Sequence, residues 1–152
     1  EFVRQAVRIS SVPDAPVDVS ERSEMVLING DRRRLARVIA NLIDNARIHG
    51  DGRPEVAIHV VDAADRPVTK VRISVEDGGA GVPEHERALV FERFARGGVS
   101  GRRADSDGAG LGLSLVAEHV RMHGGRVWVE DRIDGEQGAR FVIELDAEEL
   151  DE

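Results

Sequence analysis

The stretch DRRRLARVIANLIDNARIHG, residues 31–50, decides the fold because it predicts one long amphipathic helix. Asp31 is a favourable N-cap residue and Gly50 a favourable C-cap residue. The apolar residues between them follow the spacing of a single buried helical face: Leu35, Val38, Ile39, Leu42, Ile43 and Ala46. Such a face has to pack against another layer of secondary structure.

Strand patterns lie on both sides of this helix. Period-two or apolar runs predict strands at residues 25–30, 55–61, 70–77, 126–131 and 139–145, the last two forming a hairpin around Asp134-Gly135. A short helix is predicted at about 84–90 and a longer one over 111–125, ending at Gly124. Together they predict an α/β (α+β) two-layer sandwich: a mixed, mostly antiparallel sheet of about five strands, packed on about three helices.

Length and composition are those of one soluble globular domain. The chain has 152 residues, 41% hydrophobic and 33% charged. We expect an N-terminal linker or first strand at 1–24, the domain itself at 25–146 and a C-terminal tail at 147–152. The absence of cysteine excludes disulfides and thiolate zinc sites. We expect no signal peptide, and no apolar run approaches the ~20 residues of a membrane span.

The net charge bears on one class of partner. The formal net charge is −8, which argues against nucleic-acid binding, because proteins that bind the phosphate backbone usually carry a basic surface. A nucleotide is not excluded, since a small polyanion needs only local donors and a metal ion.

Two asparagines interrupt the apolar pattern of the long helix. On a helical wheel Asn41 and Asn45 follow one border of the buried stripe, and Asp44 falls on the opposite side. An amide oxygen there suits Mg²⁺, which takes oxygen ligands and often bridges substrate phosphates. Taken alone, the pair is more simply explained as solvated helix residues.

A first glycine-rich segment, EDGGAGVP at 76–83, directly follows a predicted strand. Its pattern is Asp77-x-Gly79-x-Gly81. Glycine lets the backbone approach a ligand closely, and an aspartate at a strand end can accept a hydrogen bond from an exocyclic amine. A tight turn would explain the same residues.

A second glycine-rich segment, GAGLGLSLV at 108–116, leads straight into a predicted helix. Glycines at 108, 110 and 112 leave backbone N–H groups open to an anion at the helix N-terminus. The segment fits neither the Rossmann fingerprint nor the P-loop. A flexible linker that ends in a glycine-rich helix start would explain it equally well.

The residues before this segment complete the pattern. A loop at 95–110 has no periodic apolar residues, so we expect it to be mobile, and it carries Arg96, Arg102 and Arg103. Just before it, VFERF contains Phe91 and Phe94, of which at least one is expected to pack in the core.

Taken in order, four segments resemble the motifs of one family. NLIDNA resembles an N box, EDGGAGVP a first glycine box, VFERF an F box and GAGLGL a second glycine box. Their order and spacing over residues 25–145 are similar to those of the ATP-binding catalytic domain of sensor histidine kinases. That family belongs to the wider group of gyrase, MutL and heat-shock chaperone ATPases.

The resemblance implies a site for Mg²⁺ and ATP. Asn45 would coordinate the metal, Asp77 would accept a hydrogen bond from the adenine amine, and residues 96–109 would form a lid. Asn41 and Asn45 would be the catalytic residues. The residues implied to contact ATP are Asn41, Asn45, Asp77, Gly79, Gly81, Phe91, Phe94, Arg96, Gly108, Gly110, Leu111, Gly112 and Leu113.

One residue within the resemblance bears on the chemistry. Related hydrolytic ATPases and anti-sigma serine kinases typically have a glutamate base where this chain has Asn41. An amide cannot take up a proton at neutral pH, so Asn41 favours transfer to a nucleophile that needs no base, such as an imidazole. The chain departs from the family at Ile48 and His49, where Lys or Arg and then Tyr are common.

The resemblance also implies partners outside this chain. None of the five histidines, at 49, 59, 85, 119 and 123, has the context of a phosphoacceptor. We therefore expect an acceptor-histidine and dimerisation domain and a response regulator as partners, with this domain on the cytoplasmic side of a membrane-anchored homodimer. The alternatives are a serine kinase or ATPase of the same fold, and a nucleotide-sensing domain without catalysis.

Overall fold

A computed structural model describes residues 1–62, 69–92 and 111–150. Its main helices are α1 (Phe2–Arg8), α2 (Arg32–His49) and α3 (Leu111–Met122), and short 3-10 helices lie at η1 (Glu21–Met25), η2 (Glu84–Glu86) and η3 (Leu89–Phe91). The strands are β1 (Val17–Val19), β2 (Val26–Leu27), β3 (Glu55–Asp62), β4 (Thr69–Asp77), β5 (Arg126–Glu130) and β6 (Ala139–Glu149).

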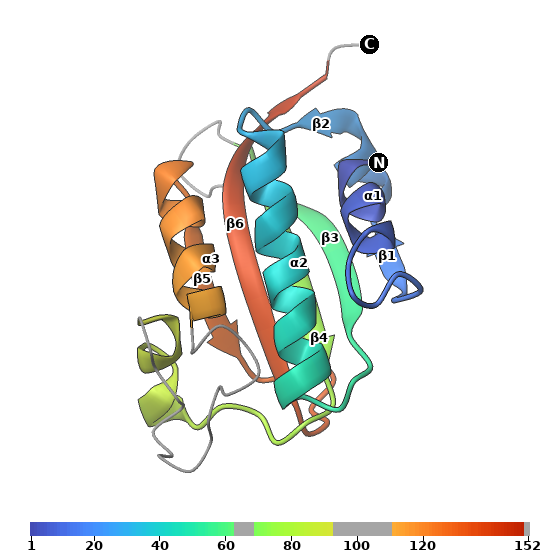
Figure 1. Cartoon of the computed structure of the whole chain (residues 1–152). Helices are drawn as coiled ribbons and strands as arrows, with labels where there is room; N and C mark the ends of the chain where they lie inside the picture. Colours follow the sequence, from blue (N-terminus) through green and yellow to red (C-terminus); the bar gives the residue numbers. More distant parts are fainter. Residues whose placement is uncertain (63–68, 93–110, 151–152) are drawn as a thin grey trace.

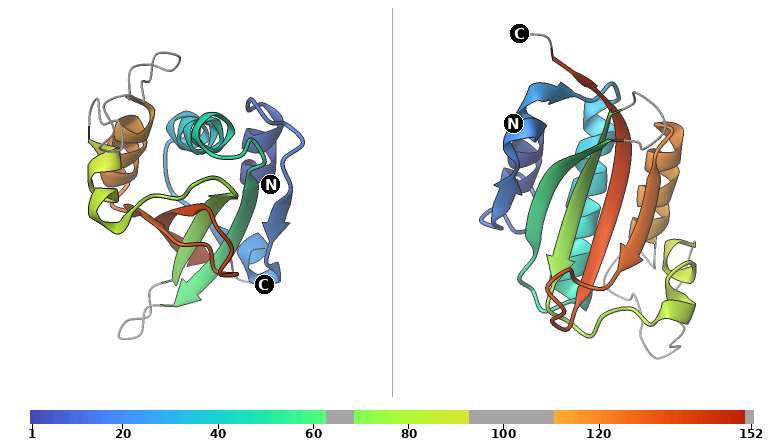
Figure 2. Two further views of the ribbon diagram at one scale, coloured as in Figure 1. Left: turned by 90° about the horizontal axis from the view of Figure 1, so that it is seen from below. Right: turned by 180° about the vertical axis from the view of Figure 1, so that it is seen from behind.

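One sheet forms the first layer. Its strand order is β1-β3-β4-β6-β2, with β5 also paired to β6. Only β1 and β3 run parallel, pairing Val17 with Val56, whereas the other neighbours are antiparallel. The three α-helices cover one face, with α2 across the middle and α1 and α3 on its two sides (Figure 1). In the views from below and behind in Figure 2, none of the three described α-helices lies on the other face.

The core lies between α2 and the sheet. Six apolar residues of α2, from Leu35 to Ala46, are at most 5% exposed. They pack against the inward positions of β4 and β6, such as Ile73 and Ile143, each 1% exposed. Period-two strands and a 3.6-period helix thus present matching apolar faces, as the sequence predicts.

The helices α2 and α3 run in opposite directions. The backbone N–H of Asp31, the N-cap of α2, donates to Nε2 of His123 at the end of α3, at 3.0 Å. A Cβ on Gly30 would lie 2.5 Å from the His123 ring, so glycine permits this contact. The C-terminal half of α2 therefore lies beside the start of α3 (Figure 1).

The predicted architecture is confirmed, with corrections to single elements. The sheet has six strands rather than about five, because β1 pairs with β3 at the edge. The segment 1–24 holds α1, β1 and most of η1, and Val3, Ala6 and Val7 of α1 are buried. The strand predicted at 139–145 continues as β6 to Glu149, past the boundary expected at 146, because β2 pairs with Glu148 and Glu149.

The predicted short helix is also different in kind. In place of the α-helix predicted at 84–90, the chain forms two separate 3-10 helices, η2 and η3, which end at Phe91. Each has only three residues and no side-chain N-cap. Among the described residues, no helix is long and apolar enough to cross a membrane.

Candidate functional site

The asparagines of α2 lie on the side of the helix that faces away from α1. Asn41 and Asn45 are both partly buried. On the α1 side, Ser11 contacts Asp44, and Arg47 Nε donates to Ser11 Oγ at 3.1 Å. On the helical wheel Asp44 lies about 60° from Asn41 and about 100° from Asn45, on the exposed flank of α2 that is nearer to α1.

The amide of Asn41 has an unusual environment. Its Nδ2 atom is buried and finds no hydrogen-bond partner within residues 1–62, 69–92 and 111–150. A buried donor without a partner is costly, so native proteins usually pair it. An oxygen of a bound ligand would satisfy this donor.

Asp77, at the end of β4, is only 3% exposed. Its Oδ1 accepts a hydrogen bond from the Gly79 N–H at 2.8 Å. Burial raises the pKa of the Asp77 carboxyl, and backbone N–H groups of Gly79 and Ala139 act in the opposite direction. Since a carboxylate has four lone-pair positions, this hydrogen bond leaves acceptor capacity for a ligand.

Glycines bring the end of α2 against the end of β4. A Cβ on Gly50 would lie 2.6 Å from Asp77 Cγ, and a Cβ on Gly79 would lie 2.7 Å from Gly50 Cα. Such distances are too short for any side chain. Asn45 lies in the last turns of α2, so the contact places the asparagine-bearing end of this helix next to Asp77.

Three further residues hold Asp77 in place, and the motif analysis did not single them out. Arg132, in the loop after β5, donates from Nη1 to the Asp77 carbonyl at 3.2 Å. Gly138 has φ +143°, and a Cβ there would lie 1.9 Å from the same carbonyl. Asp51 accepts from the backbone of Gly78, a contact that lowers the pKa of the Asp51 carboxyl.

The signal for these residues in the sequence is weak. Asp51 follows the helix C-cap, and Arg132 and Gly138 flank an Asp-Gly turn, so each is explained by local turn chemistry. Their contact with Asp77 depends on the pairing of β4 with β6, which joins Asp77 to Ala139.

Of the remaining residues predicted to contact ATP, the structure describes some and leaves others undescribed. Phe91 packs edge-on against Phe141 with ring centroids 6.1 Å apart, which is the core role expected for at least one phenylalanine. Leu111, Gly112 and Leu113 open α3, and a Cβ on Gly112 would meet no atom within 4 Å. Outside the described residues lie Phe94, Arg96, Gly108, Gly110 and the predicted lid at 96–109.

The oxygen donors of the site fit a metal ion that binds together with a phosphate-bearing ligand. In the described part of the chain, no group of three or more His, Cys, Asp and Glu could hold a metal ion. An amide oxygen of Asn45 together with phosphate oxygens and water would suit Mg²⁺, which usually keeps several waters. Position 48 is Ile, and Arg47 is turned toward Ser11, so neither supplies a phosphate-binding cation.

Comparison with known proteins identifies the family of the chain. Residues 30–149 match the family described as histidine kinase-, DNA gyrase B- and HSP90-like ATPase. The sensor-type histidine kinase PrrB of Mycobacterium tuberculosis is 38% identical over 133 residues, which cover 88% of this chain and 27% of that protein. The chain thus spans about a quarter of the length of such relatives.

Solved structures show the same fold. A mycobacterial sensor histidine kinase, MprB, superposes with a TM-score of 0.71 at 28% identity, covering 98% of this chain and 93% of that one. The ATP-binding domain of PrrB from Mycobacterium tuberculosis superposes with a TM-score of 0.62 at 32% identity, covering 95% and 87%.

Proposed function

The chain belongs to the histidine kinase-, DNA gyrase B- and HSP90-like ATPase family, and on this premise we propose that it is the catalytic domain of a sensor histidine kinase that binds ATP with Mg²⁺. The observation that carries the proposal is the corner formed by Asp77, Gly79 and Gly50. A nearly inaccessible carboxylate lies there against backbone that no side chain can enter. Such a corner suits a flat heterocycle whose exocyclic amine needs one acceptor.

Each end of the nucleotide has a matching set of groups. Asp77 accepts from the adenine amine, and Gly79 and Gly81 keep the backbone close to the ring. Gly81 has φ +83°, a conformation that favours glycine. Phe91, which packs against Phe141, supports the adenine end of the site from the core. At the other end, the start of α3 offers backbone N–H groups to the phosphates, at Leu111, Gly112 and Leu113.

The asparagines serve the phosphate end. Asn45 offers its amide oxygen to Mg²⁺, which neutralises negative charge on the phosphates when it is bound. Asn41 turns its buried N–H toward a phosphate oxygen, which satisfies a donor that has no partner among the described residues. Phe94, Arg96, Gly108 and Gly110 complete the proposed site.

The same residues suggest which nucleophile receives the phosphoryl group. Asn41 cannot act as a general base, so water and hydroxyl nucleophiles would not be activated at this position. A neutral imidazole attacks through its lone pair without losing a proton first. Catalysis then rests on positioning and charge neutralisation by this chain's residues.

The acceptor histidine is proposed to lie outside this chain. The relative from Mycobacterium tuberculosis, of which 133 matched residues are 27%, is about three times longer than this chain and is named as a sensor kinase, which supports separate acceptor and dimerisation segments. We propose a response regulator as the final acceptor, no nucleic-acid partner, and a cytoplasmic position of this domain in a membrane-anchored homodimer.

Two other functions of the same fold remain to be distinguished. A serine kinase or ATPase would need a base that position 41 does not supply. A nucleotide sensor without catalysis is favoured by Ile48, which removes the cation common at that position.

Calorimetry of ATP binding tests the proposed site directly. We expect saturable binding of ATP, tightened by Mg²⁺, because the metal and Asn45 would share the phosphates. Binding of equal affinity with Mg²⁺ and with chelator would contradict the metal assignment, and no binding in either condition would contradict the site.

A further inference from the structure

The segment 77–82, which follows β4 and forms the adenine end of the proposed site, has little backbone support of its own. Three of its six residues are glycine, which loses more conformational freedom on ordering than any other residue. Among the described residues, those at 78–82 take part in no backbone–backbone hydrogen bond of a turn, loop or helix cap. Side chains from other parts of the chain therefore have to hold this segment in one conformation.

The first end of the segment is held by Arg132, in the loop after β5. Its Nη1 donates to the carbonyl oxygen of Asp77 at 3.2 Å, and its side chain is only 15% exposed. Asp134 fixes this guanidinium at two points, accepting from Nε at 3.1 Å and from Nη2 at 2.7 Å. A forked pair of this kind also fixes the direction in which the remaining donor points.

The second end of the segment is held by Arg87, which follows η2. Its Nε donates to the carbonyl oxygen of Val82 at 2.9 Å, and its Nη2 donates to Asp131 at 2.7 Å. Asp131 directly precedes Arg132, so one short loop orients both guanidinium groups. The two arginines thus bind the carbonyl oxygens of the first and last residues of 77–82.

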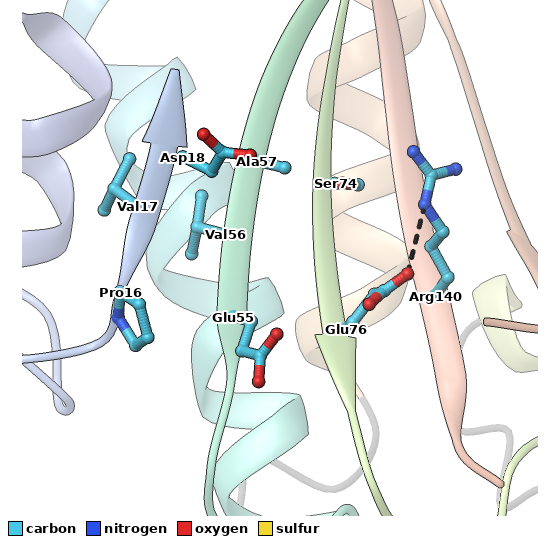
Figure 3. A pocket seen from close by; sticks show the side chains of 9 residues that line it. All are labelled: Pro16, Val17, Asp18, Glu55, Val56, Ala57, Ser74, Glu76 and Arg140. Carbon is cyan, nitrogen blue, oxygen red and sulfur yellow. Dashed lines mark ion pairs between the residues drawn. The ribbon is translucent and has the colours of Figure 1, made fainter. Parts of the chain in front are cut away.

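The strand that leads into the segment is fixed by ion pairs as well. Glu76, the residue before Asp77, lies 3.5 Å from Arg140, as Figure 3 shows, and 3.8 Å from Arg132. Arg140 is only 4% exposed, so this end of β4 has little room to move. The freedom that remains lies in the glycines between the two bound carbonyl groups.

We propose that Arg87 and Arg132 are positioning residues of the nucleotide site, which raise its affinity by ordering the segment 77–82 before ATP binds. The identity of the ligand in this inference rests on the proposed function. A segment that is already ordered adds no ordering cost on binding, whereas a mobile one lowers the apparent affinity by the fraction of time for which it is ordered. Each arginine acts through a backbone carbonyl and not through contact with the nucleotide.

Backbone order parameters from NMR relaxation, measured on the chain without nucleotide, test the ordering itself. In the parent, Gly79 and Gly81 should have values near ~0.85, which is typical of rigid backbone. Arg132→Met and Arg87→Met remove the donors but keep much of the side-chain length, and should lower these values to below ~0.6. Parental values in both variants, or a segment that is already mobile in the parent, would overturn the proposal.

Calorimetry tests the consequence for ATP. Arg87→Met and Arg132→Met should each bind ATP about fivefold more weakly or worse, because the segment then has to be ordered on binding. The loss should be the same with Mg²⁺ and with chelator, since the phosphate end of the site is unchanged. A loss that appears only with Mg²⁺ would place the effect at the phosphates and overturn the proposal.

Arg22→Met is the matched control for general destabilisation. Arg22 donates to Asp62 at 2.7 Å and to Glu149 at 3.0 Å, at the opposite end of β3 and β4 from Asp77. This variant also loses a bridging guanidinium but should bind ATP as the parent does. An ATP affinity reduced as much as in Arg132→Met would assign the effect to the fold as a whole and overturn the proposal.

A double-mutant cycle tests whether Asp134 acts through Arg132. Asp134→Asn should weaken ATP binding in the parent and change it little in Arg132→Met, because the guanidinium that it orients is then absent. Fully additive losses would contradict this arrangement.

The same titrations distinguish this inference from the proposed function. ATP binding by the parent that persists unchanged in folded Arg87→Met and Arg132→Met would refute the positioning role and leave the nucleotide site intact. A parent that binds no ATP would contradict the proposed function, and the positioning role with it.

Discussion

At the scale of single residues, Asp77 combines a structural cost with a proposed function. Burial raises the pKa of its carboxyl above the ordinary value of 3.8, so the ionised form is less stable in the folded chain than in the unfolded one. This lowers the free energy of unfolding at neutral pH, and the loss disappears as the pH falls through the raised pKa of Asp77 toward 3.8. A buried carboxylate with a raised pKa is typical of a functional site.

Asp77→Asn should therefore separate stability from binding. We expect the free energy of unfolding in urea to be equal to or higher than that of the parent at pH 7, with the difference shrinking on acidification toward pH 3.8. ATP affinity should fall by about tenfold or more, because an acceptor facing the adenine amine becomes a donor. Calorimetric affinity within about twofold of the parent would refute the adenine role, and Asp14→Asn serves as an exposed control.

A second prediction at the residue scale concerns Asn45 as the proposed ligand of Mg²⁺. Asn45→Ala should remove most of the gain in ATP affinity that Mg²⁺ provides, while affinity in chelator stays near that of the parent. The measurement is a pair of titrations, with Mg²⁺ and with chelator, on both proteins. A Mg²⁺ gain of parental size in the variant would mean that the metal is held elsewhere.

At the scale of elements, the turn between β5 and β6 controls the position of Asp77. Gly138→Ala would force a Cβ to within 1.9 Å of the Asp77 carbonyl at a residue with φ +143°. We expect a loss of about 3 kcal/mol in the free energy of unfolding, typical of a backbone clash combined with strain.

Gly135→Ala is the matched control in the same turn. Gly135 has φ +80° but open space around it, so it should lose only about 1 kcal/mol, the cost of positive φ alone. Urea unfolding of both variants measures the difference. Equal losses would show that the contact with Asp77 contributes nothing.

The elements also show how far sequence alone leads. The periodicity of α2 and the alternation in β4 predict both elements to within one or two residues, because each has one face in the core. The helix α1 was not predicted, since its seven residues are too few to show a period and bury only Val3, Ala6 and Val7. Arg132 and Gly138 were missed because their role arises from strand pairing, a contact between segments far apart in the chain.

At the scale of the whole molecule, the two faces of the sheet carry different side chains. The helical face holds the asparagines, Asp77 and the glycine contacts, and the open face holds the paired charges of Arg72, Arg126, Arg140, Glu76 and Glu144. The four motifs predicted the family because their order along the chain is far more specific than any one of them.

The absence of a base at position 41 makes the central claim testable in one measurement. The chain alone, incubated with labelled ATP and Mg²⁺, should show almost no hydrolysis and no self-phosphorylation. After addition of the acceptor-helix domain of its full-length protein, we predict label on a histidine of that domain, stable in base and lost in acid. Rapid ATP hydrolysis by the chain alone, or acid-stable phosphate on serine or threonine, would contradict the histidine-kinase account.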